Sequence, residues 1–226
     1  MTAKKEIEHF APLIRAAQAG RNGAAPDALF DLRRQAGAWF VENGFPGARD
    51  EEWRFTDLSP LRNTEFALYG ETPRLSSVDL EPLLWEGGQL PRLVFVNGRF
   101  NAALSSQTLP KQVRMLSLKE AMVEPMVSEQ LARRVTFRQN GIAALNTALT
   151  ADGAFLYVAA GAVVAQPLLL LFIAVPTALP AAVFPRNLVV IAENARTSFI
   201  EHYVTLGTGA HFTNPVTEVV LAEGAV

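Results

Sequence analysis

The chain of 226 residues contains no cysteine. This absence excludes disulfide bonds, thiolate nucleophiles and clusters held by cysteine sulfur from the chain itself. Only three histidines are present, His9, His202 and His211, and none has the spacing of a metal-chelating motif. No glycine-rich phosphate loop and no nucleophile elbow occurs. The sequence therefore favours a scaffold over an enzyme, and we expect the chain to hold no metal or cofactor of its own.

Long apolar runs and an excess of one charge are also missing. The longest apolar run, Pro167 to Pro176, has ten residues, whereas a membrane-spanning helix needs about 20. The N-terminus lacks the apolar core of a signal peptide. The net charge is −2 and the pI is near 6.0, so nothing points to a nucleic-acid or membrane partner. We expect a soluble, cytoplasmic protein.

Charged side chains become rarer along the chain and divide it into three regions. Residues 1–75 hold 21 of them, residues 76–150 hold 14, and residues 151–226 hold seven. The last change falls at Asp152-Gly153, a strong turn pair. We expect a helical region, an α/β connecting region, and then a stack of strands whose inward residues are apolar and whose corners are small.

The first region is predicted to be helical. A helix that is capped by Thr2 and ends at Gly20 places Ile7, Phe10 and Ile14 on one apolar stripe. A second helix opens near Pro26 and ends before Gly44, which suits a helix C-terminus. The loop between them is short and rich in glycine, so the two helices are expected to form an antiparallel pair.

The middle region mixes strands and helices. Asn97-Gly98 lies between two strand-like runs and is the strongest hairpin signal in the chain, because both residues tolerate the positive φ of a type I′ turn. A following strand ends in a capping box made by Ser117 and Glu120, which starts a short helix. A further helix, kinked or split at Gly141, is expected between residues 128 and 150.

The last region repeats a motif of small residues. Ala159-Ala-Gly-Ala162, Ala192-Glu-Asn-Ala195 and Ala222-Glu-Gly-Ala225 recur at offsets of about 33 and 30 residues, as in solenoids. Their third position is Gly or Asn, which tolerate positive φ at a tight corner. We therefore expect a mixed α and β fold that ends in the first coils of a right-handed parallel β-helix. The final coil is incomplete at Val226, so we expect the front part of a longer protein.

Three groups of polar residues are candidates for chemistry, and each has a structural alternative. Asp50-Glu51-Glu52 could supply paired carboxylates or a metal site. We favour an acidic helix start, with Trp53 as a buried packing anchor and Arg54 paired with an acid.

The other two groups lie in the last region. His202 and His211, with Glu201, could suggest a metal site. However, consecutive strand residues face opposite ways, so Glu201 and His202 are not expected to converge. Arg186-Asn187 could touch a substrate, but the pair is more typical of the entry to a strand. We select no catalytic, cofactor-binding or metal-binding residue.

Four segments resemble one known family. They are Arg49–Leu61, Leu93–Ser105, Ile142–Gly153 and Pro185–Val190. Taken in order, from about residue 30 to the end of the chain, they resemble the SufD branch of the SufB/SufD family of iron–sulfur cluster assembly proteins. The Leu-Asn-Thr-Ala and Asp-Gly region is shared with SufB, whereas the Glu-Glu-Trp-Arg segment points to SufD.

The resemblance implies a three-part scaffold without enzymatic activity. An N-terminal helical region precedes a right-handed parallel β-helix, and a C-terminal helical region binds the SufC ATPase. SufD pairs with SufB through the β-helices, and a cluster is present only transiently in the complex. The functional histidine and the SufC-binding segment of the family belong to parts beyond Val226, so no residue here is given their role.

Two other classes of protein were weighed. A carbohydrate-active β-helix enzyme needs clustered Asp, Lys or Arg on one face, but residues 151–226 contain no Lys and a single Asp. A stand-alone β-solenoid interaction module is the other alternative, because an open sheet edge pairs readily. Few charges remain after Asp152 to discourage such pairing, so we expect the last coil to self-associate or to fray.

Overall fold

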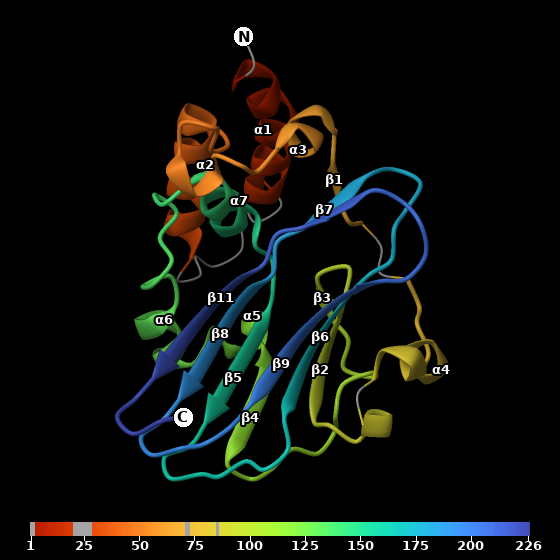
Figure 1. Ribbon diagram of the computed structural model, residues 1–226, viewed down its shortest axis with the longest axis vertical. Helices are drawn as coiled ribbons and strands as arrows, with labels where there is room; N and C mark the ends of the chain where they lie inside the picture. Colours follow the sequence, from red (N-terminus) through yellow and green to blue (C-terminus); the bar gives the residue numbers. More distant parts are fainter. Residues whose placement is uncertain (1–2, 20–28, 71–72, 85) are drawn as a thin grey trace.

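The computed structural model describes residues 3–19, 29–70, 73–84 and 86–226. The fold is mixed α and β, with three small, mostly parallel sheets. Most helices gather at one end of the molecule, and the strands run below them (Figure 1). The predicted mixed class is confirmed.

Helices occur in both the first and the middle region. None of those that the structure describes is long and apolar enough to cross a lipid bilayer. The α-helices are α1 Ala3–Ala19, α2 Phe30–Asn43, α3 Ser59–Asn63, α4 Ser77–Leu80, α5 Leu118–Ala121, α6 Pro125–Gln130 and α7 Gly141–Leu149. The 3-10 turns are η1 Glu51–Trp53, η2 Glu81–Leu83 and η3 Glu86–Gly88.

The strands form three sheets. Their order is β1-β7-β10 in the first, β11-β8-β5-β4 in the second and β3-β2-β6-β9 in the third. The strands are β1 Ala67–Leu68, β2 Arg92–Val96, β3 Arg99–Phe100, β4 Val113–Ser117, β5 Ala154–Val158, β6 Leu168–Ala174, β7 Ala181–Val183, β8 Arg186–Ile191, β9 Phe199–Thr205, β10 His211–Thr213 and β11 Val216–Leu221.

From residue 154 on, successive strands belong to the three sheets in a fixed order. β5, β6 and β7 each contribute to a different sheet, and β8, β9 and β10 then pair with them in parallel in the same order. The register joins Phe155 to Leu188, 33 residues on, and Ala181 to His211, 30 residues on. β11 begins a third pass beside β8. The predicted right-handed parallel β-helix stays a prediction.

Strands from earlier in the chain extend all three sheets on the opposite side. β1 pairs in parallel with β7, β2 pairs in parallel with β6, and β4 pairs antiparallel with β5. One edge of the stack is therefore built from the first two regions. The boundaries at residues 75 and 150 stay predictions.

The small-residue corners are where the sequence places them. Gly161, Asn194 and Gly224 have φ angles of 69°, 56° and 67°. Their backbones stack, because the Gly161 N–H donates to the Glu193 carbonyl at 2.8 Å and the Asn194 N–H donates to the Glu223 carbonyl at 2.9 Å. The repeat in the sequence is thus a repeat of one left-handed corner.

The helical end has an aromatic core. Phe10, Phe40 and Phe45 are buried, and their rings meet edge to face at centroid distances of 5.2–5.9 Å. Ile14 is buried beside them, as the helical stripe predicts. The expected helix boundaries at Thr2, Gly20 and Pro26 lie outside the described residues, whereas Gly44 follows α2 with a φ of 69°.

The middle region confirms two predictions and corrects a third. Asn97 and Gly98 turn the β2–β3 hairpin with φ angles of 49° and 74°, and Ser117 with Glu120 forms the capping box of α5. The helix expected over 128–150 is wrong in extent, since residues 131–140 are not helical. α7 starts at Gly141, where an added Cβ would lie 2.0 Å from the Gly44 carbonyl oxygen.

Candidate functional site

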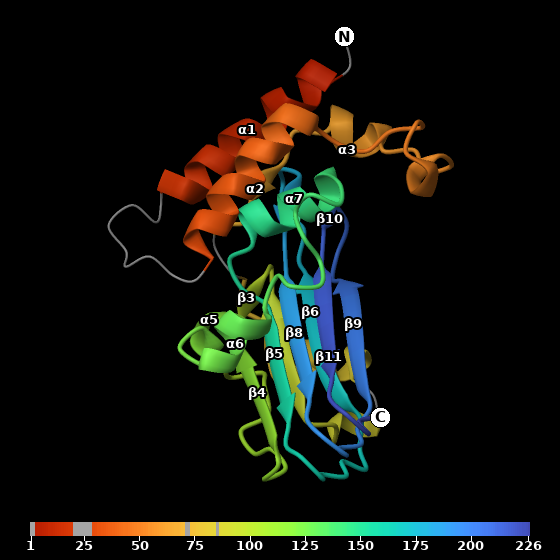
Figure 2. The same ribbon diagram turned by 90° about the vertical axis from the view of Figure 1, so that its left-hand side faces the viewer.

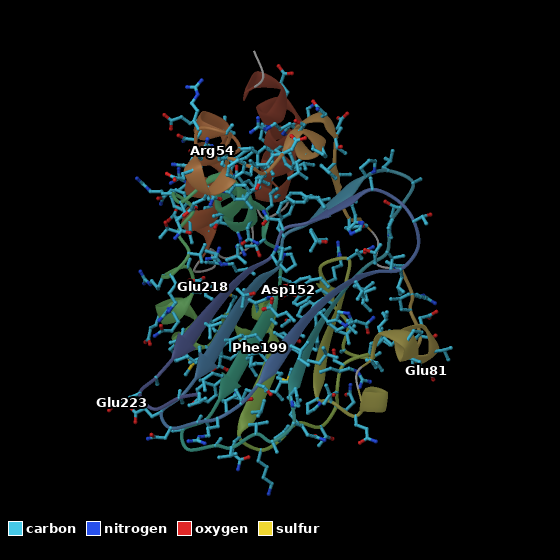
Figure 3. All side chains as sticks on the ribbon, viewed as in Figure 1. Arg54, Glu81, Asp152, Phe199, Glu218 and Glu223 are labelled. Carbon is cyan, nitrogen blue, oxygen red and sulfur yellow. The ribbon has the colours of Figure 1, made fainter. Side chains whose placement is uncertain are left out.

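Arg186 and Glu218 form a fully buried ion pair between β8 and β11. The Arg186 Nη2 lies 2.6 Å from the Glu218 Oε1, and the side chains are 2% and 0% exposed. Glu218 is at the end of β11 that faces the helices (Figures 1 and 3). A buried pair of this kind is costly to break, because either partner alone leaves an uncompensated charge.

The Glu218 carboxylate also holds the segment between α6 and α7. It accepts hydrogen bonds from the backbone N–H groups of Ala132 at 2.7 Å and Arg134 at 2.8 Å. Burial alone would raise the pKa of Glu218, but the Arg186 charge and these backbone donors lower it below its ordinary value. The carboxylate is therefore kept ionised by its surroundings.

Arg186 joins the same segment to α7. Its guanidinium donates to the Val135 carbonyl at 2.9 Å, to the Thr147 hydroxyl at 3.2 Å and to the Asn146 amide oxygen at 3.3 Å. All of these partners lie within the chain, and Arg186 is the first residue of β8. The interpretation as entry to a strand is therefore confirmed.

A second polar network lies between the facing sheets. Glu201 accepts hydrogen bonds from the Thr217 hydroxyl at 2.6 Å and from the Tyr203 hydroxyl at 3.0 Å. The Asn187 amide nitrogen lies within 3.1–3.4 Å of all three side chains, while its oxygen accepts from the Ala154 N–H at 2.8 Å. Burial, followed by the Glu201 charge, raises the pKa of Tyr203 well above its usual range, so the phenol stays protonated and donates.

The histidines do not join this network. His202 pairs in register with Leu171, which faces the outer side of its sheet, whereas Glu201 pairs with the inward Leu170. His211 lies on β10, where its Nε2 is 3.0 Å from the Thr205 hydroxyl. Over the described ranges, no group of three or more His, Cys, Asp or Glu side chains could hold a metal ion. The predicted lack of convergence between Glu201 and His202 is confirmed.

The acidic cluster starts a turn, as expected, but its aromatic residue is less buried than predicted. Asp50 precedes η1 and accepts the Gly47 N–H at 2.7 Å. Trp53 is half-buried and lies outside the hydrophobic core clusters. The Arg54 guanidinium lies 5.2 Å from the ring centroid of Phe55, which is 92% exposed. Among the described contacts Arg54 therefore meets an aromatic ring, and its predicted pairing with an acid is wrong.

A cleft of about 1100 Å³ is bordered by β1, β3, β7 and α5. Arg74, Arg99 and Lys119 contribute cations to its lining, and Glu120 and Asp152 contribute carboxylates. Both carboxylates are occupied as helix and turn caps: Glu120 accepts the Ser117 N–H, and Asp152 accepts the Lys119 N–H. Burial raises the pKa of Asp152 above its ordinary value.

Comparison with known proteins shows to which family the chain belongs. Residues 4–170 match the family model for the SufBD protein N-terminal region. The chain belongs to the SufBD family. It is also 32% identical, over 225 residues, to a protein of Synechocystis sp. (strain ATCC 27184 / PCC 6803 / Kazusa) named as an iron-sulfur cluster assembly SufBD family protein. That match covers 92% of this chain and 48% of the relative, so the chain spans about half the length of the curated relative it matches.

The two polar networks of this SufBD chain were only partly predictable from the sequence. Arg186, Asn187 and Glu201 were singled out, but two of their partners were not. Glu218 lies 32 residues after Arg186, and Thr217 lies 30 residues after Asn187. The available signal was periodicity, since Glu201 and Glu218 are carboxylates inside apolar strands of a repeating stack. A polar residue at such a position needs a partner on a neighbouring strand.

Proposed function

We propose that this SufBD chain is a non-enzymatic scaffold subunit in iron–sulfur cluster assembly, of the SufD type. The observation that carries the proposal is the match along 92% of the chain to a relative named for that process. The Glu51-Glu52-Trp53-Arg54 segment favours SufD over SufB. Two carboxylates described above support a scaffold, because the buried Glu218 and the half-buried Glu201 accept hydrogen bonds within the chain.

The scaffold would be built on the first coils of a right-handed parallel β-helix. Three observations support this architecture: strands rotate through three sheets, their register advances by 30–33 residues, and positive-φ corners stack. Each coil of such a solenoid covers the apolar face of the coil before it. Strand order and parallel pairing alone do not give the hand of the coil, so right-handedness rests on the rule that parallel crossovers are right-handed.

The partners that this role implies are a SufB-like paralogue and a SufC-like ATPase. A cluster would be present only transiently, on the assembled complex, since the chain has no cysteine to ligate one. The relative is about twice as long as the matched region. We therefore assign the contacts with either partner to no residue of this chain.

Co-purification tests the scaffold role. The tagged chain would be co-expressed with the SufB-like and SufC-like proteins of its own organism, and the Synechocystis relative with its own partners would serve as the positive control. We expect the paralogue or the ATPase to be retained at a stoichiometric level through several washes. If the relative retains its partners and this chain retains neither, the scaffold role of this chain is wrong.

A further inference from the structure

The cleft of about 1100 Å³ lies on the side of the sheets away from β9 and β11. β3 and β9 are at opposite ends of one sheet, and β4, which leads into α5, and β11 are at opposite ends of another. Figure 2 shows β3 and α5 on one side of the strands and β9 and β11 on the other. The described lining residues run from Leu68 to Pro185. The walls of the cleft therefore do not involve the last strands.

Much of the lining is hydrocarbon. It consists of aliphatic and aromatic side chains from β1, β3, α7, β7 and the residue after β7, of which the last two groups and α7 contribute buried ones. These residues are Leu68, Phe100, Leu149, Ala182, Val183 and Phe184. Such a surface gains free energy when the apolar part of a ligand covers it.

The uncharged polar side chains of the lining are already in use. The Asn97 amide accepts the Val175 N–H at 2.7 Å and donates to the Val175 carbonyl at 3.2 Å. The Ser117 hydroxyl and the Asn101 amide oxygen each accept a backbone N–H. Little is left to recognise the many polar groups of a sugar or a nucleobase. The body of a matching ligand is therefore a plain aliphatic chain.

The charged side chains of the cleft are unevenly distributed. Lys119, Glu120 and Asp152 lie beside the start of α5, where Asp152 accepts the Lys119 N–H at 3.0 Å. Arg74 and Arg99 come from the segment after β1 and from β3. Neither arginine forms an ion pair with any residue that the structure describes. An anion in the cleft is therefore attracted toward the arginines and repelled by the acids beside α5.

The end of β1 brings an arginine and an unpaired phenol together. The Arg99 Nη2 donates to the Gly70 carbonyl at 3.0 Å, which occupies one of the five N–H donors of its guanidinium. Tyr69, the residue before Gly70, is only 9% exposed. Its hydroxyl is buried and has no hydrogen-bond partner among the described residues. A buried hydroxyl without a partner is unfavourable, so a ligand that supplies an acceptor is favoured.

We propose that this cleft binds a single-chain aliphatic carboxylate. The chain covers the apolar lining, and the carboxylate accepts hydrogen bonds from the Arg99 guanidinium and the Tyr69 hydroxyl. A guanidinium matches the geometry of a carboxylate, and both bonds are strengthened by charge. The Tyr69 hydroxyl has almost no exposed surface, so binding turns its ring toward the carboxylate. The inference does not rest on a role in cluster assembly.

Calorimetric titration of the chain with three probes is the first test. Decanoate carries both the chain and the charge, decan-1-ol keeps the chain without the charge, and acetate keeps the carboxylate without the chain. We expect decanoate to bind at one site per protein, at least about tenfold more tightly than decan-1-ol, because only decanoate offers a charged acceptor. Acetate should show no measurable binding.

Substitutions locate the bound probe. Arg99→Gln and Tyr69→Phe should each weaken decanoate at least about fivefold and leave decan-1-ol unchanged. Arg49→Gln is the matched control, since Arg49 is exposed and lies outside the cleft. Ala103→Trp places a bulky ring at an exposed position of the lining, and it should abolish binding of both ten-carbon probes. The urea midpoint of Tyr69→Phe should not fall, because the hydroxyl loses no partner.

Three results would each overturn the proposal. Decanoate that does not bind, or binds no more tightly than decan-1-ol, would show that the cleft selects no carboxylate. Decanoate binding that is unchanged by Ala103→Trp would place the probe on another apolar surface. Equal affinity in Tyr69→Phe and the unchanged chain would remove the phenol from the site. If circular dichroism shows that Arg99→Gln loses its strands, Arg99→Lys decides that arm, since it keeps the charge but not the paired donors.

Discussion

At the scale of single residues, the buried polar groups explain how two distant parts of the chain are fixed to each other. Glu218 belongs to the last strand, yet it holds the backbone of residues 132 and 134 and neutralises Arg186. Sequence reasoning found Arg186 but not its partner, because 32 residues separate the two. Only the offset of the repeat places Glu218 beside the start of β8.

Replacement of Glu218 by glutamine should strongly destabilise the fold. The change leaves Arg186 buried without a counter-charge, so we expect the free energy of unfolding to fall by about 3–5 kcal/mol. Urea denaturation followed by circular dichroism would measure it. Glu223→Gln is the matched control at the far end of β11 (Figure 3), and it should change stability by less than about 0.5 kcal/mol. Equal effects of the two changes would contradict the role of the pair.

The same carboxylate predicts how stability depends on pH. The folded pKa of Glu218 is lowered, so its contribution to stability is fully present above the ordinary value of about 4.3 and is lost as the pH falls through the folded value. The gap in urea midpoint between the unchanged chain and Glu218→Gln should therefore narrow as the pH falls from 6 to 3. A gap that stays constant over this range would show that the charge of Glu218 is not the stabilising feature.

At the scale of elements, the sequence predicted the turns better than the strands they connect. The corners at Gly161 and Asn194, the Asn97-Gly98 hairpin and the capping box at Ser117 were all correct, because each depends on the local conformational preference of one or two residues. The run from Pro167 to Pro176 was recognised only as apolar. Its residues Leu168–Ala174 form β6, which is buried along its whole length, and no alternation marks such a strand.

Contacts between residues far apart in the sequence determine the element boundaries that the sequence did not predict. The split between α6 and α7 follows from the docking of residues 132–135 on Arg186 and Glu218, and the close approach of Gly141 to Gly44 fixes where α7 begins. The docking of residues 132–135 leaves no local signal in the sequence, whereas Gly141 was the local signal for the predicted kink or split. The candidate site was limited in the same way, since the Glu201 network joins three strands of the stack.

The corner at Gly161 should accept asparagine better than alanine. Its φ is 69° and an added Cβ would meet no atom within 4 Å, so backbone conformation alone decides the outcome. Gly161→Ala should lower the free energy of unfolding by about 1–2 kcal/mol, and Gly161→Asn by less, as asparagine occupies the equivalent corner at Asn194. Urea denaturation of the three proteins checks the order. A more stable alanine variant would contradict the left-handed corner.

At the scale of the whole molecule, the strands before residue 151 close one end of the stack, and β9 and β11 form the other. The family match covers residues 4–170, and the strands pair mostly in parallel. The expected self-association of the last coil stays a prediction. The inward direction of Glu201 could not be recognised until the register of β9 was known.

The purified chain should contain no tightly held metal. It has no thiolate, and the described side chains offer no group of three suitable ligands. Elemental analysis after dialysis against a chelator should find iron and zinc far below one per chain. Lysozyme carried through the same dialysis would serve as the blank. A stoichiometric metal that resists the chelator would contradict this expectation.

The pairing of Arg186 with Glu218 also sets an order of events during synthesis on the ribosome. Arg186 leaves the ribosome 32 residues before the carboxylate that neutralises it, which corresponds to about 2–6 s at the usual speed of translation. During that interval Arg186 has no counter-charge, so we expect its guanidinium to stay in water and the segment at residues 132–135 to stay undocked. The helical end is therefore synthesised early, but its packing is completed only after β11 has been synthesised. A pause in translation between these two codons would prolong the period in which the half-made protein is vulnerable.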